Sequence, residues 1–159
     1  MKPALAASLT LVAFGGLAAD LSPPIAYPSG YRDWRHVKSM IIEPGHALAG
    51  TFGGIHHLYA NEKALEGYST GRFPDGSIIV FDLLEAVSAD ETVTEGARKL
   101  VGVMVKDGTR HAATGGWGFE GFAGDSTSER LVGNKATEAC FACHQAQTAK
   151  DYVFSAARP

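Results

Sequence analysis

Both cysteines of the chain lie in one short segment, EACFACHQA, near its C-terminus. Cys140 and Cys143 are three positions apart, and His144 follows the second cysteine directly. The surrounding residues, 134–148, predict a helix with Thr137 near its start. Because positions i, i+3 and i+4 of a helix project from one face, two thiols and an imidazole would meet on that face. Whatever fold the chain adopts must leave room for what this face holds.

Cys-x-x-Cys-His is the attachment sequence of c-type haem. The two thiols bind the haem vinyl groups as thioethers, and the imidazole ligates the iron. The motif therefore predicts one covalent haem c per chain, bound by Cys140 and Cys143, with the iron on His144. Three alternatives fit less well. A zinc site needs a fourth ligand, a thioredoxin-like pair lies early in a βαβ domain, and a disulfide across two residues is strained.

The late position of the motif limits which residues could bind the iron on the side opposite His144. Only 15 residues follow His144, and none of them is His or Met. A sixth ligand would have to come from upstream, and an open iron face is equally allowed. The upstream candidates are His46, His56, His57, His111, Met40, Met104 and Lys106.

The N-terminus is typical of a secretory signal peptide. Lys2 precedes an apolar stretch that is too short to span a bilayer and ends in small residues. We expect residues 1–19 to be a signal peptide cut near Ala18 or Ala19; the alternative is an apolar helix that stays in place. Residues 20–30, with three prolines, predict an extended leader. The protein is thus expected in the oxidising periplasm, which fits haem attachment outside the cytoplasm.

The rest of the chain, 31–159, has the length of one domain, the predicted haem-binding domain. Apolar residues make up 45% of the sequence and charged residues 19%, as in an ordinary globular protein. The net charge of -3 and the lack of a basic run argue against a nucleic-acid partner. We do not expect the chain to be an integral membrane protein, because its one apolar stretch is too short to span a bilayer.

The order of predicted elements indicates the fold class. Hydrophobic spacing and turn residues predict helices over 29–40, 62–71 and 134–148, strands over 51–60, 77–87, 98–108 and 115–124, and a polar loop over 88–97. We therefore expect an α+β fold, with a mainly antiparallel sheet, flanking helices and a C-terminal haem-bearing helix.

Several short segments occur together in an order that resembles one family. They are YRDWRHVKS, PDGSIIV, VMVKD, TGGWGFEGF and CFACH followed by DYVFS. The chain is similar to the cytochrome P-460 and cytochrome c′-beta family from about Tyr31 to Ser155. The resemblance implies a mostly antiparallel β-domain, a haem on the C-terminal helix with His144 proximal, a homodimer and one open iron face.

The family has two functional branches, and the chain is nearer the c′-beta branch. In the branch that oxidises hydroxylamine, a lysine is linked to the haem ring and a distal carboxylate accepts protons. These positions correspond here to Phe81 and Gly102, and a distal arginine corresponds to His56. Phe81 matches the gas-binding c′-beta branch, in which aromatic rings cap the distal pocket.

Strand alternation is compatible with such a pocket. Ile79 and Phe81 share one face of their predicted strand, and Phe52 and His56 share a face of another. Bound dioxygen gathers negative charge and needs a hydrogen-bond donor, which Phe81 cannot supply, so nitric oxide and carbon monoxide would be preferred. His56 complicates this expectation, because its ring could reach a bound ligand or ligate the iron. The plainer alternative is that Phe81 is ordinary core.

Three functions remain open at this stage. The first is an exported mono-haem cytochrome that binds nitric oxide and carbon monoxide, for nitric oxide capture, sensing or detoxification. The second is a cytochrome P-460-type oxidoreductase acting on hydroxylamine or peroxide. The third is a six-coordinate electron carrier with a redox partner protein. The departures at Phe81 and Gly102 favour a binding protein over an enzyme.

Overall fold

The computed structural model describes residues 24–158. The predicted signal peptide, residues 1–19, and the first part of the predicted leader lie outside the described residues. Residues 24–28 have no regular secondary structure and lead into a single 3₁₀ turn, Tyr31–Asp33. Among residues 24–158, no helix has the length and apolar character needed to cross a membrane.

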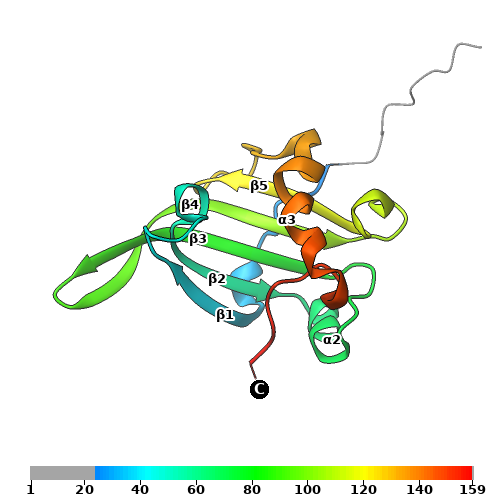
Figure 1. The fold of residues 1–159 in the computed structure, drawn as a ribbon, viewed down its shortest axis with the longest axis horizontal. Helices are drawn as coiled ribbons and strands as arrows, with labels where there is room; N and C mark the ends of the chain where they lie inside the picture. Colours follow the sequence, from blue (N-terminus) through cyan, green and yellow to red (C-terminus); the bar gives the residue numbers. More distant parts are fainter. Residues whose placement is uncertain (1–23, 159) are drawn as a thin grey trace, which may run out of the picture.

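Five strands form one antiparallel sheet in the order in which they occur in the chain (Figure 1). Their bounds are β1 Arg35–Ile42, β2 Gly54–Ala60, β3 Ile78–Ala89, β4 Thr92–Lys106 and β5 Trp117–Ala123. The α-helices are α1 Ala49–Phe52, α2 Glu62–Thr70 and α3 Ala142–His144. The predicted α+β class, mainly antiparallel sheet with a C-terminal helix, is confirmed.

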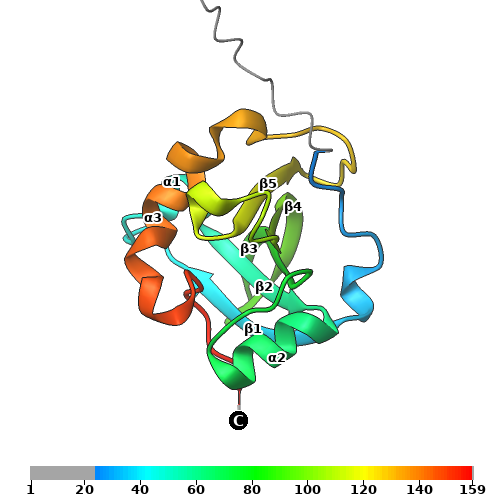
Figure 2. The ribbon, with the colours of Figure 1, turned by 90° about the vertical axis from the view of Figure 1, so that its right-hand side faces the viewer.

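The sheet has two differently covered faces, which Figure 2 shows on opposite sides of the strands. The helix face lies under α2 and the C-terminal helical segment, and its buried cluster includes Ile79 and Phe119. The leader face lies under residues 24–34, and its cluster includes Val80 and Phe122. Neighbouring residues thus belong to different clusters, because side chains of a strand alternate between faces.

The predicted helix over 62–71 is confirmed as α2, which ends one residue earlier, at Thr70. The Asn61 side chain accepts a hydrogen bond of 2.9 Å from the Ala64 amide, so it caps the N-terminus of α2. Gly71 ends the helix in the left-handed region, with φ of 79°.

The prediction of a helix over residues 29–40 is wrong. After the turn Tyr31–Asp33, the chain forms strand β1. Tyr31 is buried on the leader face and Val37 on the helix face. The apolar residues that predicted a helix therefore pack on opposite faces of the sheet, because the chain passes the edge of the sheet between them. A helix would have required the two side chains to share one face.

The prediction of a polar loop over residues 88–97 is also wrong. Strands β3 and β4 continue through it and meet at Asp90 and Glu91, whose φ angles of 49° and 59° suit a tight hairpin turn. This hairpin projects beyond the other strands (Figure 1), and its residues are exposed on both faces. Without a buried face, its sequence lacks the apolar alternation that indicates a strand.

The segment predicted as the C-terminal helix is helical from Gly133 to Lys150 but not uniform. A 3₁₀ turn, Gly133–Lys135, precedes a π-helical turn, Thr137–Phe141, which is followed by α3 and a 3₁₀ segment, Gln145–Lys150. The π-helical turn contains Cys140. Such turns are rare and frequently occur at functional sites.

Candidate functional site

The two cysteines lie on the part of the C-terminal segment that crosses the helix face. Cys140 is half-buried and packs against the cluster of Ile79 and Phe119, whereas Cys143 is exposed. Both thiols are free. Burial raises the pKa of Cys140 to about 11, with smaller contributions from Glu120 and Cys143, so its thiol is protonated at neutral pH.

The imidazole of His144 has one nitrogen occupied and one available. Its Nδ1 lies 2.8 Å from the backbone carbonyl oxygen of Tyr152. A carbonyl only accepts hydrogen bonds, so Nδ1 carries the proton and Nε2 keeps its lone pair. Burial lowers the pKa of His144, which keeps the ring neutral. A neutral ring whose Nδ1–H is bound elsewhere is the form in which histidine ligates a metal.

Phe81 is the centre of an aromatic group on the helix face. Its ring centroid lies 4.5 Å from that of His56 and 5.8 Å from that of Phe52. Ile79, two residues earlier on β3, is buried in the cluster beneath the C-terminal segment. The four residues predicted for the distal pocket therefore belong to the same face of the sheet as Cys140.

Phe52 reaches this group from a different element than the sequence predicted. It ends the short helix α1, and strand β2 begins only at Gly54. Gly54 has a φ of 132°, and a β-carbon there would collide with the carbonyl oxygen of Leu84 on β3. The backbone at Gly54 thus approaches strand β3 closely, whereas a β-carbon at Gly53 would meet the carbonyl oxygen of Ala49 in α1.

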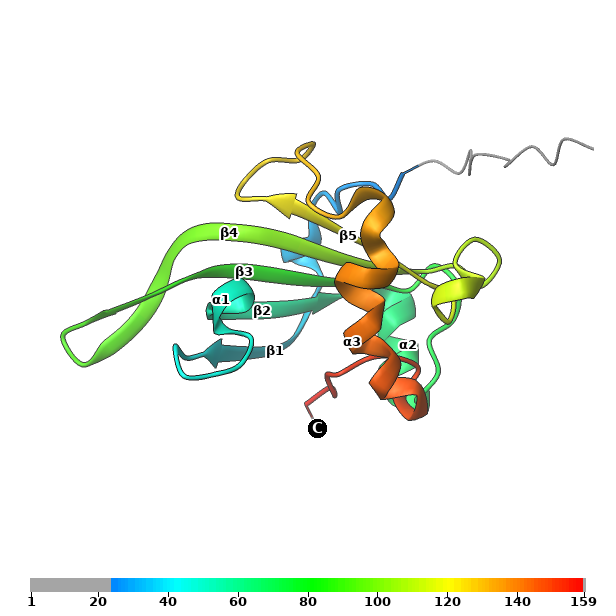
Figure 3. The same ribbon diagram turned by 45° about the horizontal axis from the view of Figure 1, so that its top comes forward.

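Part of the helix face near Phe81 is only half-covered. We call this region the open sheet patch; it consists of Phe52, Leu58, Phe81, Leu100, Gly102 and Met104, all of intermediate exposure. Figure 3 shows α1 and α3 standing over this same face of the strands. An apolar surface of this kind, beside two thiols and an available imidazole nitrogen, suits a flat apolar cofactor.

His56 combines deep burial with an unsatisfied polar atom. His56 is 3% exposed, and its Nδ1 has no hydrogen-bond partner among the described residues. Burial, with a smaller contribution from His57, lowers the pKa of His56 to about 4, so the ring is neutral. A buried nitrogen without a partner is rare and needs a physical explanation, of which a group bound at the site is one.

The remaining sixth-ligand candidates are distributed over the molecule. Met104 belongs to the open sheet patch, while Met40 is 52% exposed on the edge strand β1. Lys106 donates to Asp151 over 2.7 Å.

His57 lies on the leader face, where its Nδ1 is 2.6 Å from Ser39 Oγ and its Nε2 is 2.7 Å from Glu95 Oε1. His46 accepts from the Leu48 amide, and His111 packs over Gly118.

Among residues 24–158, no group of three or more His, Cys, Asp or Glu side chains could hold a metal ion. A metal bound by His144 would therefore need further donors from the cofactor itself. A porphyrin supplies four nitrogens, so the donor set of Cys140, Cys143 and His144 fits haem and does not fit a zinc site.

Sequence reasoning missed Asp151 and the carbonyl of Tyr152. Asp151 is 5% exposed, although charged residues are almost never buried without a partner. In the sequence, DYVFS carries only the family resemblance. The role of a backbone carbonyl has no signal in a sequence, because every residue carries one.

An antiparallel sheet that presents an apolar patch, together with a thiol-bearing helix and a neutral histidine, is the arrangement that a haem protein requires. The family model of cytochrome P460 matches residues 28–155, most of the chain. The protein belongs to the cytochrome P460 family, and membership implies a haem cofactor. The match does not separate the c′-beta branch from the hydroxylamine-oxidising one. No curated protein matches the sequence significantly.

Proposed function

We propose that this protein is an exported mono-haem cytochrome that binds nitric oxide and carbon monoxide at an open iron face. Cys140 and Cys143 would hold one haem c through thioethers, and His144 Nε2 would be the proximal ligand. The bound haem would supply an iron able to take a diatomic gas. The observation that supports this function best is the contact of the Phe81 ring with the rings of Phe52 and His56, within the half-covered open sheet patch.

The chemistry of this group favours some gases over others. Phe81 and Phe52 offer no hydrogen-bond donor and exclude water, which disfavours bound dioxygen because it gathers negative charge. Nitric oxide and carbon monoxide need no donor. The neutral ring of His56 adds no positive charge to the site at pH 7. We therefore assign the protein to nitric oxide capture, sensing or detoxification in the periplasm, as a homodimer.

The hydroxylamine-oxidising alternative has less support. The resemblance makes Phe81 and Gly102 the counterparts of a lysine and a carboxylate, and neither residue has the required group. Lys106, the next lysine on the same face, already binds Asp151 and the Gly115 carbonyl. Neither Phe81 nor Lys106 thus offers a free amine for a link to the haem ring.

A six-coordinate cytochrome with His56 as sixth ligand is a second candidate. It is favoured by one observation, the unpartnered Nδ1 of a residue that is almost fully buried. In that case the protein would carry electrons to or from a redox partner protein. His56→Ala would then convert a low-spin spectrum into a high-spin one, whereas it would change little if His56 only packs on Phe81.

Optical and resonance Raman spectra of the purified protein in both redox states test the proposal. We expect a five-coordinate high-spin ferrous haem that binds nitric oxide and carbon monoxide but not dioxygen. A low-spin six-coordinate haem would replace the first function by the electron-transfer alternative. A strongly red-shifted ferrous band with a haem-to-chain link would replace it by hydroxylamine oxidation.

A further inference from the structure

The chain reverses direction immediately after the haem-bearing helical segment. Asp151 and Tyr152 have φ angles of 50° and 65°, in the left-handed region that non-glycine residues seldom occupy. The reversal returns the Tyr152 carbonyl to Nδ1 of His144, eight residues earlier, over 2.8 Å. Two consecutive strained residues persist only where the surroundings hold them in place.

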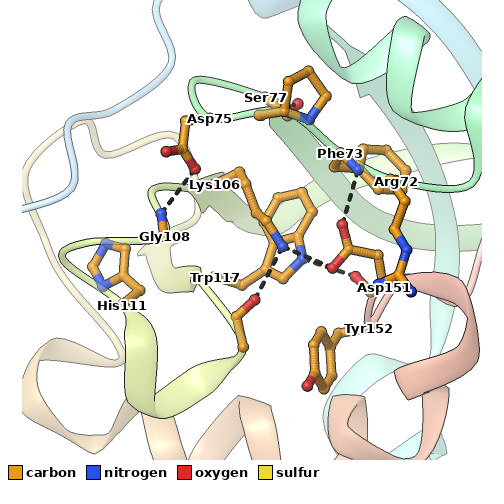
Figure 4. A network of polar contacts seen from close by, with 12 residues as sticks. Arg72, Phe73, Asp75, Ser77, Lys106, Gly108, His111, Trp117, Asp151 and Tyr152 are labelled. Carbon is orange, nitrogen blue, oxygen red and sulfur yellow. Dashed lines mark hydrogen bonds and ion pairs between the residues drawn. The ribbon is translucent and has the colours of Figure 1, made fainter.

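Asp151 makes the contacts that hold this turn (Figure 4). Its Oδ2 accepts from the Phe73 amide over 2.8 Å, and its backbone carbonyl accepts from Trp117 Nε1 over 2.8 Å. Its own amide donates to the Thr148 carbonyl over 3.2 Å. One residue thus ties the end of the helical segment to β5 and to the turn before β3.

Lys106 is the counter-ion of Asp151. Its Nζ lies 2.7 Å from Asp151 Oδ1, donates to the Gly115 carbonyl over 3.0 Å and stands 5.1 Å from the Trp117 ring centroid. The two charged side chains are only 12% and 6% exposed, so the pair is little screened by solvent. The ring of Tyr152 lies against Gly115, where a β-carbon would collide with it.

We propose that Asp151, fixed by Lys106, is a positioning residue for the proximal ligand. The inference rests on the proposed role of His144 and extends it to residues with no contact to the iron. Asp151 holds the Tyr152 carbonyl against Nδ1–H, which fixes the tautomer and ring orientation of His144 and raises the basicity of Nε2. A more basic ligand stabilises ferric iron, so the pair lowers the reduction potential.

Two variants of the holoprotein separate the partners. Asp151→Asn keeps an oxygen for the Phe73 amide but loses the charge that Lys106 requires. Lys106→Met removes the counter-ion and leaves both carboxylate oxygens on Asp151. The matched control is Asp75→Asn, since Asp75 Oδ1 accepts from the Gly108 amide over 2.8 Å nearby, a hydrogen bond that does not involve residues 137–152.

Two measurements report on His144 itself. The first is hydrogen exchange of the His144 Nδ1–H, followed by NMR in the diamagnetic ferrous carbonyl or six-coordinate state. We expect both variants to exchange about tenfold faster, which corresponds to about 1.4 kcal/mol of local stability. The second is the midpoint potential, expected to move to more positive values in both. The double variant should add nothing to the single ones, and Asp75→Asn should match the wild type.

One outcome overturns the proposal. If the variants melt lower but keep wild-type exchange at Nδ1–H and the wild-type potential, Asp151 and Lys106 only stabilise the fold. If Asp151→Asn does not fold, Lys106→Met carries the same test. A wild-type protein that is six-coordinate, or that binds no gas, would contradict the proposed function but not this inference. Both measurements report on a proximal His144 whether the iron is five- or six-coordinate.

Discussion

Phe81 on β3 pairs directly with Gly102 on β4, and a β-carbon built on Gly102 would lie 3.4 Å from the β-carbon of Phe81. The two positions therefore share the helix face and touch. The family resemblance assigns a haem-linked lysine and a distal carboxylate to these same two positions. Their adjacency explains how one branch could use them together, and how an aromatic ring beside a glycine leaves an apolar surface instead.

Replacing Phe81 by Ala should speed and strengthen carbon monoxide binding while lowering the melting temperature. The ring is part of the open sheet patch, and its removal should cost about 3 kcal/mol of stability once haem covers it. Flash photolysis and thermal unfolding of the same holoprotein measure the two effects. Phe73→Ala is the control, since Phe73 is 6% exposed in the buried cluster of the helix face and should only lose stability. Unchanged carbon monoxide kinetics in Phe81→Ala would make Phe81 ordinary core.

The holoprotein should not turn over hydroxylamine. Phe81 and Gly102 lack the amine and the carboxylate that the resemblance requires there. Intact-mass spectrometry should give the mass of the chain plus one haem, with no additional link. Sustained turnover together with a cross-linked mass would mean that another lysine, Lys106 first, has left its pair with Asp151.

Acidification should destabilise the protein through His56. An unfolded histidine takes up a proton near pH 6.5, whereas burial holds the pKa of His56 at about 4. The stability from this depressed pKa is complete above about pH 6.5 and is lost as the pH falls towards 4, by about 3 kcal/mol in total. Denaturant titrations between pH 7.5 and 4 measure it. His56→Phe should show a flatter profile, and identical profiles would contradict the burial argument.

Covalent attachment should survive denaturation. Acidic organic extraction should leave haem on the wild-type chain, because thioethers at Cys140 and Cys143 do not dissociate. Cys140→Ala or Cys143→Ala should retain one thioether at most, and His144→Ala should change the ligation of the iron without releasing the haem. Complete extraction of haem from the wild type would overturn the assignment of haem c.

Asp82, on the leader face, should be essential for the stability of the fold. It is 2% exposed and accepts from Tyr31 Oη and Arg98 Nε, each over 2.6 Å. Asp82→Ala would leave the Arg98 guanidinium buried without this partner, at a cost of about 3–5 kcal/mol in unfolding free energy.

Asp125 provides the control for Asp82. It also binds Arg98, but its side chain is 80% exposed, so Asp125→Ala should cost less than about 1 kcal/mol. Neither variant should change the haem spectrum, because both residues lie away from the helix face. Equal losses of stability for the two variants would contradict the importance of burial here.

The elements that the sequence predicted best have local causes. Helix α2 begins and ends at residues with a defined local function, Asn61 as cap and Gly71 in the left-handed region. The C-terminal helix and its three donor residues follow from spacing within one turn. Such signals need no knowledge of the rest of the fold, and they were sufficient to predict Cys140, Cys143 and His144 as one candidate site.

The elements that the sequence did not predict depend on distant neighbours. Strand β1 and the β3–β4 hairpin are exposed over much of their length, so neither shows a clear apolar period. Phe52 has the parity of His56 by coincidence, since α1 and not β2 carries it to Phe81. The turn at Asp151 depends on Lys106 and Phe73, residues far away in sequence that only the folded chain brings together.

Each strand pairs with its predecessor, so the sheet can be assembled in step with the N-to-C appearance of the chain. Chains with such short-range strand pairing fold quickly for a β-rich protein. The residues that bind Asp151 and flank His144, namely Phe73, Lys106, Trp117 and Phe119, all precede the thiol-bearing segment in sequence. A chain made from its N-terminus therefore contains these four residues before Cys140, and residues 137–152 are the last part of the site to be made.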